Sequence, residues 1–157
     1  MRATLLLSCA LAACAPIPAQ TVSPEHDPQL LTKLFEDARS MEPQVAPAFA
    51  CVSIREGTVD RDPAESLVDE LAARWSTPVI PGSRCSLGGQ GGTVVVPGVS
   101  GTGKWLRVTN LQCSDANHCI ADVSYYVANL AAGGHRVAAE RSRSGWQITP
   151  SEIRWIS

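Results

Sequence analysis

The spacing of hydrophobic residues predicts two helices in the first half of the chain. In the first helix, Asp27 is a capping residue, Pro28 occupies the first turn, and apolar residues then recur at spacings of three and four. These apolar residues are Leu30, Leu31, Leu34, Phe35, Ala38 and Met41. The second helix begins with Asp62 as its cap and a proline at the next position, and it must end by Thr77 because a proline follows. Each helix has one apolar face to bury.

From residue 104 onward, the pattern changes to short alternations that are typical of strands. Strands are predicted over residues 104–113, 119–131, 135–143, 146–149 and 153–156, with turns at Gly133-Gly134, Ser144-Gly145 and Pro150-Ser151. Residues 48–54 form an earlier candidate strand. Because such short connections join antiparallel neighbours, the chain is expected to be an α+β fold. Two N-terminal helices would pack on a mostly antiparallel meander sheet of about five or six strands.

A glycine-rich segment, residues 76–103, separates the second helix from these strands. It ends in the spacing G-x-x-x-x-G-K, from Gly98 to Lys104. A phosphate-binding loop needs Ser or Thr after the lysine and a helix beginning there. Trp105 follows instead, within a predicted strand, so nucleotide binding is excluded. The segment is interpreted as a mobile surface loop, and no cofactor is expected.

The first residues have the layout of an export signal: Arg2, then an apolar run to Ala13, then Pro16 and Pro18. This run is too short to span a bilayer. The stretch from Leu11 to Cys14 resembles the lipobox of bacterial lipoproteins, which implies cleavage before Cys14 and lipidation of that cysteine.

Cleavage after Ala19 is the alternative to the lipobox site, and it would release a soluble periplasmic or secreted protein. Residues 1–19 are therefore interpreted as the export signal and residues 20–157 as a single α+β domain. The expected location is the periplasm or, through a lipid anchor at Cys14, the outer membrane. That anchor would be the only contact with a membrane.

Four of the six cysteines remain after the leader is set aside. In an oxidising compartment an even number favours two disulfides. Three pairings are possible, and the short polar loop between Cys113 and Cys119 favours a bond closing a hairpin, which leaves Cys51 to bond Cys85. A zinc site using these cysteines with His118 is disfavoured because no C-x-x-C spacing exists. No metal is expected.

The charge of the chain is close to neutral, with a formal net charge of −2, which gives no indication of nucleic-acid binding. The common hydrolase motifs G-x-S-x-G, S-x-x-K and H-E-x-x-H do not occur. Asp60 and Asp62 are interpreted as turn and capping residues rather than metal ligands. No catalytic residue is predicted, although Asp122, expected opposite Asn110, is the carboxylate of most interest.

The proposed bond between Cys113 and Cys119 predicts a register for the hairpin. Without a β-bulge, Arg107 would lie opposite Tyr125, and both would face the helices together with Trp105. These three residues are the predicted ligand-binding site, in which the guanidinium of Arg107 would hold an anionic group in a pocket between the sheet and the helices. The alternative is that Arg107 extends its charged end into water.

The closing strands resemble the end of a nuclear transport factor 2-like domain. The resemblance rests on Tyr125-Tyr126, the Gly133-Gly134 pair and the segment from Ser144 to Ile148. It implies a cone of curved antiparallel sheet closed by helices, with a cavity that many such domains use for small molecules. Because this fold is shared by enzymes and non-enzymes, it does not decide between catalysis and binding.

The function expected from the sequence is that of an exported cell-envelope protein acting as a non-catalytic binding or interaction module. Its partner would be a small anionic ligand or another envelope protein. The alternative is a small-molecule hydrolase or isomerase with its cavity between sheet and helices.

Overall fold

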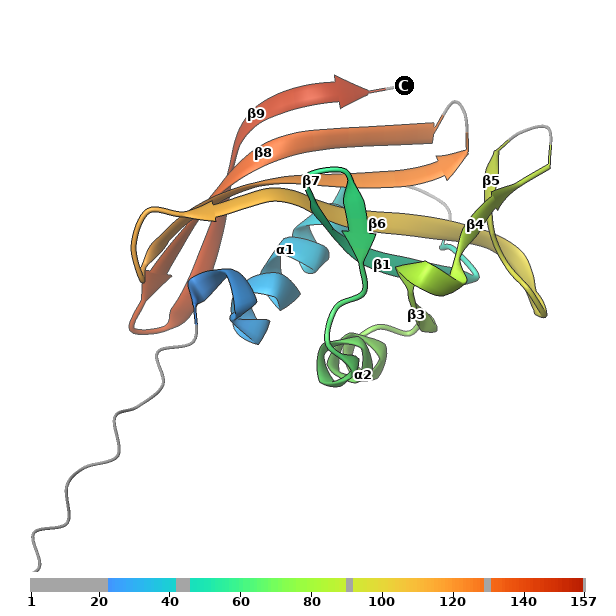
Figure 1. Ribbon diagram of the computed structural model, residues 1–157, viewed down its shortest axis with the longest axis horizontal. Coiled ribbons are helices and arrows are strands. Elements are labelled where there is room, and N and C mark those ends of the chain that lie inside the picture. The colour runs from blue at the N-terminus through green and yellow to red at the C-terminus, as the bar shows by residue number, and fades with distance from the viewer. Residues whose placement is uncertain (1–22, 42–45, 90–91, 129–130, 157) are drawn as a thin grey trace, which may run out of the picture.

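The structure is a computed structural model, and it describes residues 23–41, 46–89, 92–128 and 131–156. The predicted leader, with Cys14 and Ala19, lies outside the described residues. Figure 1 shows the described elements. In chain order these are η1 (Pro24–His26), α1 (Pro28–Ser40), β1 (Phe49–Glu56), β2 (Val59–Arg61), α2 (Glu65–Arg74), β3 (Val79–Pro81), η2 (Gly82–Arg84), β4 (Ser86–Gly88), β5 (Thr93–Val96), β6 (Val99–Cys113), β7 (His118–Ala128), β8 (Ala131–Ser142) and β9 (Gly145–Ile156).

The strands form one mixed sheet, nine-stranded in the described part of the chain, with the central order β2-β1-β6-β7-β8-β9. Strand β1 runs parallel to both β3 and β6, whereas β6 to β9 form an antiparallel meander. The α+β class is therefore confirmed. The prediction of two N-terminal helices on a five- or six-strand meander is wrong, because β1 and β2 lie between the helices and β1 pairs in parallel with a distant strand.

The glycine-rich segment 76–103 is not a loop. It contains β3, η2, β4, β5 and the start of β6. Gly103 lies against the ring of Phe49 so closely that an added Cβ would overlap it. This glycine therefore serves close packing between paired strands rather than flexibility. Lys104 follows in the same strand, is 3% exposed, and donates from Nζ to the carbonyl of Arg39 at 3.0 Å.

Strands β8 and β9 run through two of the predicted turns. Gly133 and Gly134 lie inside β8, and Pro150 and Ser151 lie inside β9. The pairing of β8 with β9 shifts register next to these positions. The glycines and the proline therefore lie at β-bulges, which locally interrupt the hydrogen bonds between two strands while both strands continue.

The capping prediction is confirmed for the first helix. The Oδ1 atom of Asp27 accepts a hydrogen bond from the backbone N–H of Gln29 at 2.9 Å. Its Oδ2 atom accepts from Nε1 of Trp146 at 3.0 Å and lies 3.3 Å from Nη1 of Arg141. One carboxylate thus caps α1 and attaches it to the β8–β9 hairpin. His135 of β8 adds a second attachment, since its Nε2 lies 2.7 Å from Oδ2 of Asp37 in α1.

The capping prediction is wrong for the second helix. Helix α2 begins at Glu65, and its N-cap, Ala64, has no side-chain hydrogen bond. Asp62 instead accepts hydrogen bonds from the backbone N–H and the hydroxyl of Ser83 in η2. The local pattern was that of a cap, but a turn distant in sequence supplied better donors.

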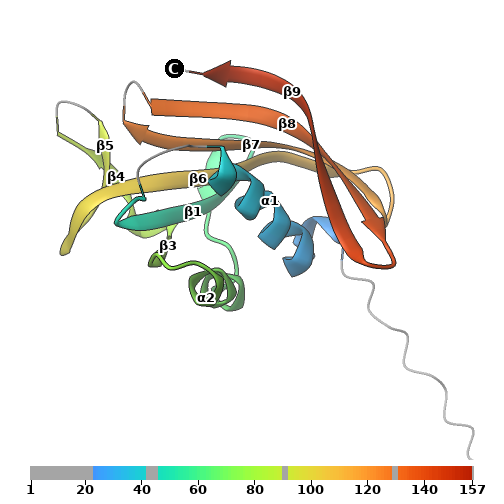
Figure 2. The ribbon, with the colours of Figure 1, turned by 180° about the vertical axis from the view of Figure 1, so that it is seen from behind.

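Two apolar clusters lie on opposite faces of the sheet. The larger cluster joins α1 and α2 to one face, here called the helix face, and Figure 2 shows α1 lying against it. Its sheet residues include Val52, Leu106, Val108 and Val123. The smaller cluster lies under β4 and β5 on the other face, here called the open face, and consists of Phe49, Cys51, Ile80, Cys85, Val94 and Val96.

Both predicted disulfides are confirmed. Cys113 bonds Cys119 across the β6–β7 hairpin, and Cys51 bonds Cys85 over a sequence separation of 34. The longer bond lies within the smaller cluster, where Cys51 is fully buried. It therefore attaches η2 to the central strand β1.

Candidate functional site

A β-bulge in β6 overturns the predicted register. From Cys113 to Gln112 the pairing with β7 is as predicted, but it shifts between Gln112 and Thr109. Arg107 consequently pairs with Ser124 instead of Tyr125. The bulge contains Asn110, whose φ of 51° lies in the left-handed region that asparagine tolerates better than most residues.

The one-residue shift separates the three predicted site residues. Because side chains alternate along a strand, Trp105 and Arg107 are moved to the open face, whereas Tyr125 remains on the helix face and packs against the larger cluster. Cζ of Arg107 lies 5.1 Å from the centroid of the Trp105 ring. Tyr125 instead lies beneath the ammonium group of Lys104, with the centroid of its ring 4.9 Å from Nζ. The predicted pocket between sheet and helices is therefore not formed around Arg107.

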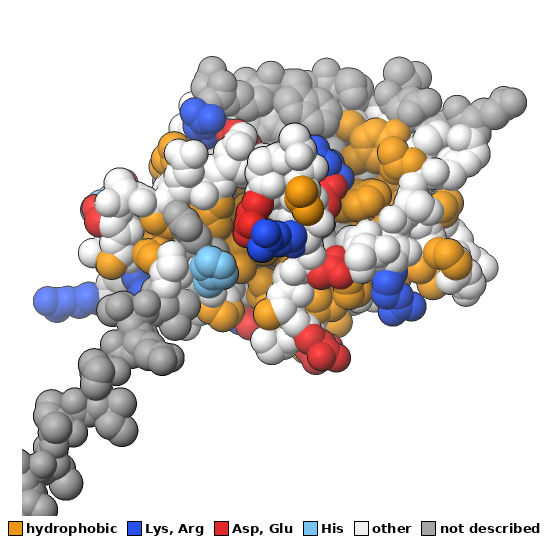
Figure 3. Space-filling view, viewed as in Figure 1, with side chains coloured by type: hydrophobic (Ala, Val, Ile, Leu, Met, Phe, Trp, Pro, Cys, Tyr) orange, Lys and Arg blue, Asp and Glu red, His pale blue; other side chains and the backbone are white. Residues whose placement is uncertain are grey.

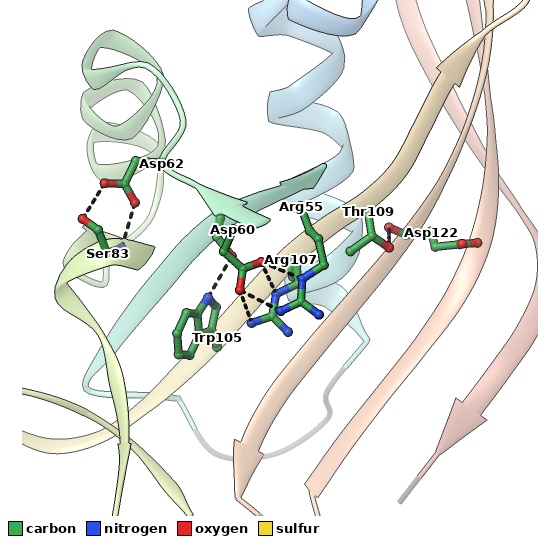
Figure 4. A network of polar contacts seen from close by, with 9 residues as sticks. Arg55, Asp60, Asp62, Ser83, Trp105, Arg107, Thr109 and Asp122 are labelled. Atoms are coloured by element: carbon green, nitrogen blue, oxygen red, sulfur yellow. Dashed lines mark hydrogen bonds and ion pairs between the residues drawn. The ribbon is translucent and has the colours of Figure 1, made fainter. Parts of the chain in front are cut away.

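Arg107 belongs to a charged network that sequence reasoning did not identify. Figure 4 shows Arg55 of β1 and Arg107 of β6 converging on the carboxylate of Asp60 in β2. Arg55 donates from Nε to Oδ1 at 2.9 Å and from Nη2 to Oδ2 at 2.7 Å. Arg107 donates from Nη2 to Oδ2 at 3.1 Å, and its buried Nε lies 3.1 Å from Oδ1 without hydrogen-bond alignment.

The two guanidinium groups determine the protonation of this network. Burial acts to raise the pKa of Asp60, but the hydrogen bond from Arg55 and the charges of Arg107 and Arg55 hold it below its usual value. Burial lowers the pKa of Arg107, and Arg55 adds to this effect, while Asp60 opposes both. An arginine in a protein still retains its proton at neutral pH. The network therefore consists of two cations and one anion.

A third arginine extends the charge along the open face. Arg136 of β8 donates from Nε to Oδ1 of Asp122 at 3.0 Å, and Asn110 donates to Oδ2 of the same carboxylate at 2.8 Å. A cavity of about 430 Å³ lies over these side chains. It is lined by Arg55, Arg107, Thr109, Asn110, Asp122, Val123, Ser124, Gly134, His135 and Arg136. The prediction that Asp122 lies opposite Asn110 is wrong, because the bulge pairs Asp122 with Thr109, although the side chain of Asn110 still reaches its carboxylate.

The charged network borders an aromatic region. Trp105 donates from Nε1 to the hydroxyl of Ser53 at 2.9 Å, which fixes its indole against β1. Trp105 and Tyr126 both pack, partly exposed, against the smaller cluster. In Figure 3, hydrophobic side chains gather to the right of the β1–β2 hairpin, towards β4 and β5. The open face therefore combines permanent cations with exposed ring surface.

A second cavity, of about 520 Å³, lies where the β1–β2 hairpin approaches η1 and the start of α2. Its lining includes the apolar side chains of Leu31, Ile54 and Leu111. It shares Arg55 and Asn110 with the cavity on the open face. These two side chains therefore border both cavities.

Chemically, the open face is suited to binding anions. Guanidinium groups donate hydrogen bonds in a fixed planar fork and neither take up nor release protons near neutral pH. Among the described residues, no group of three or more His, Cys, Asp or Glu side chains is placed to hold a metal ion. Comparison with known protein families, curated proteins and solved structures finds no match to this chain.

Part of the network had a signal in the sequence. Gly57 marks a turn between two short segments of strand-like sequence, which is typical of a hairpin. Such a hairpin places Arg55 opposite Asp60, and the structure shows this pairing. Bringing Arg107 to the same carboxylate requires the parallel pairing of β1 with β6, in which Ser53 pairs with Arg107. No local pattern in the sequence indicates that two strands so far apart in the chain pair in parallel.

Proposed function

We propose that this chain is an exported protein of the cell envelope that binds a ligand through an anionic group on the open face of its sheet. The observation that carries this proposal is the placement of Arg55 on β1, Arg107 on β6 and Arg136 on β8 around one cavity of that face. Arg55 and Arg107 direct two positive charges at the single carboxylate of Asp60. The excess positive charge favours an anion.

Binding is favoured over catalysis because apolar side chains fill the helix face of the sheet and the charged side chains lie on the open face. The space between helices and sheet, where a hydrolase or isomerase cavity was expected, holds the larger apolar cluster. The carboxylate next to Arg107 lies on the opposite, open face and is 29% exposed. The lining of the cavity on the open face includes three arginines, whose fixed charge and donor geometry suit recognition and orientation of an anion.

The expected effect of Arg107→Gln is a loss of anion affinity of about tenfold or more, because the charged fork is replaced by a shorter, neutral amide. Calorimetry at low ionic strength would measure binding of benzoate and inorganic phosphate. Benzamide, which has the same ring as benzoate but no charge, serves as the uncharged control ligand. Arg74→Gln is the matched control, since Arg74 is 51% exposed on α2 and pairs with Glu70 there. Equal affinity for both anions in the Arg107 and Arg74 variants would contradict the assignment.

Export is supported by the leader pattern and by two disulfides, which persist in oxidising compartments. Among the described residues, no helix is long and apolar enough to cross a membrane. We propose that the chain is anchored through a lipidated Cys14, as its resemblance to a lipobox implies, and that the domain is thereby held at the outer membrane.

The form of the mature N-terminus tests this localisation. Mass spectrometry of the protein purified from its native host is expected to find a chain that begins at an acylated Cys14. A chain beginning at Gln20 would contradict the lipid anchor and leave a soluble exported protein. A chain retaining Met1 would contradict export itself.

A further inference from the structure

The carboxylate of Asp60 contacts the guanidinium groups of Arg55 and Arg107 in the way that the carboxylate of a bound ligand would. Each of its two carboxylate oxygens lies within 3.1 Å of one nitrogen from Arg55 and one from Arg107. Arg55 donates from Nε and Nη2 to the two oxygens, which is the two-point geometry in which arginine recognises a carboxylate. Arg107 adds one hydrogen bond from Nη2, and its Nε lies close to Oδ1 without alignment.

The segment that carries Asp60 is held weakly. Strand β2 has three residues, Val59–Arg61, and all three are exposed. Among the described strands it pairs only with β1, at the end of the sheet order. Val59 at its start is 57% exposed and contributes nothing to either core. A short edge strand with no buried side chain opens at low free-energy cost.

The arginines, in contrast, are held firmly on the strands of the sheet. Arg107 is stacked on Trp105, whose indole is hydrogen-bonded to the fully buried Ser53. Arg55 lies on β1, and its pairing with Thr109 of β6 does not depend on β2. Opening of β2 would therefore remove the carboxylate and leave the two forks in place. Preorganised donors of this kind bind without a large ordering cost.

We propose that Asp60 is an internal substitute for the carboxylate of the ligand, which binds Arg55 and Arg107 by displacing Asp60 and opening the β1–β2 hairpin. This inference rests on the proposed function and specifies its ligand as a carboxylate. The two arginines already hold a carboxylate, that of Asp60, in the position that a ligand carboxylate would take. The low pKa of Asp60 agrees with it, because the site stabilises an ionised carboxylate.

The exchange conserves the interactions of the site. The ligand carboxylate replaces the hydrogen bonds that Asp60 gives up, and Asp60 becomes hydrated at the exposed hairpin. An aromatic or apolar body on the ligand would also contact Trp105 and Tyr126, which lie on the same face. The net affinity therefore depends on the contacts that the rest of the ligand makes with these rings. Ligands with different bodies would bind with different affinities, which makes the site selective.

The test compares Asp60→Asn with Glu56→Gln, with benzoate as the probe. Glu56 lies on the same hairpin, and its carboxylate pairs with the exposed Arg61 at 3.2 Å rather than with Arg55 or Arg107. Both substitutions remove one negative charge. Removing the internal competitor is expected to tighten benzoate binding about tenfold, because hydrogen bonds to charged groups no longer have to be broken. The Glu56 variant is expected to change it by less than about twofold.

Hydrogen exchange on the unaltered protein gives an independent measurement that does not depend on a variant folding. Saturating benzoate is expected to speed exchange of the Val59–Arg61 amides while the amides of β6 stay protected. Slower exchange in β2, or equal benzoate affinity in the Asp60 and Glu56 variants, would overturn the displacement. Phosphate binding as tight as benzoate would overturn the carboxylate assignment.

The two proposals fail differently. If neither benzoate nor phosphate binds the unaltered protein, the proposed function fails and this inference fails with it. If anions bind and Arg107→Gln abolishes binding, but Asp60→Asn behaves as its control, only the displacement is refuted.

Discussion

Replacement of Leu106 by alanine is expected to lower the free energy of unfolding by about 3 kcal/mol, because a fully buried side chain leaves a cavity in the larger cluster. Urea unfolding at neutral pH would measure the change. The register without a bulge would place Leu106 on the face away from the helices, so this substitution tests which residues of β6 face the core.

Leu87→Ala is the control for that experiment, since it removes the same atoms from a side chain that is 56% exposed on β4. Its expected effect is below about 0.5 kcal/mol. Equal effects of the two substitutions would contradict the assignment of Leu106 to the helix face.

Removal of the longer disulfide, by replacing Cys51 and Cys85 with alanine together, is expected to lower the free energy of unfolding by about 3.8 kcal/mol. The chain-entropy relation gives this value for a loop of this length, since the bond restricts the unfolded chain. Thermal or urea unfolding under non-reducing conditions would measure it.

The corresponding double substitution of Cys113 and Cys119 is the matched comparison. That bond closes a loop with a sequence separation of only 6, for which the same relation gives about 2.4 kcal/mol. A larger loss from the short loop than from the long one would show that loop length does not govern these bonds.

Local signals in the sequence were sufficient where the interacting residues are neighbours in the chain. The cap at Asp27 depends on an N–H group two residues away, and the bond between Cys113 and Cys119 depends on one short hairpin. Pairing these two cysteines then left Cys51 and Cys85 as the second bond. The strand expected over residues 48–54 is β1.

Local signals failed where a distant segment competed for the same group. Asp62 had the pattern of a helix cap, but η2 presents a backbone N–H and a hydroxyl to its carboxylate. Gly133 and Pro150 had the pattern of turns, but their strands continue through β-bulges because neighbouring strands hold them in the ladder. Propensity describes the isolated segment, and pairing with the rest of the sheet outweighs it.

The proposed binding site shows the same division between local and long-range signals. The sequence predicted Trp105, Arg107 and Tyr125 as site residues and correctly placed Tyr125 of β7 on the helix face. It could not place the bulge at Asn110. Since side chains on a strand alternate with a period of two, one extra residue exchanges the two faces of β6 beyond that point.

What the sequence determined by itself is the α+β class, the start of the first helix, the cysteine pairs and the residue types available for binding an anion. What only the tertiary structure decided is which of these residues meet. The parallel pairing of β1 with β6 brings Arg55 and Arg107 to one carboxylate, and the bulge in β6 turns Arg107 to the face opposite Tyr125. Both depend on contacts between segments far apart in the chain, whose register is set by the packing of the whole sheet.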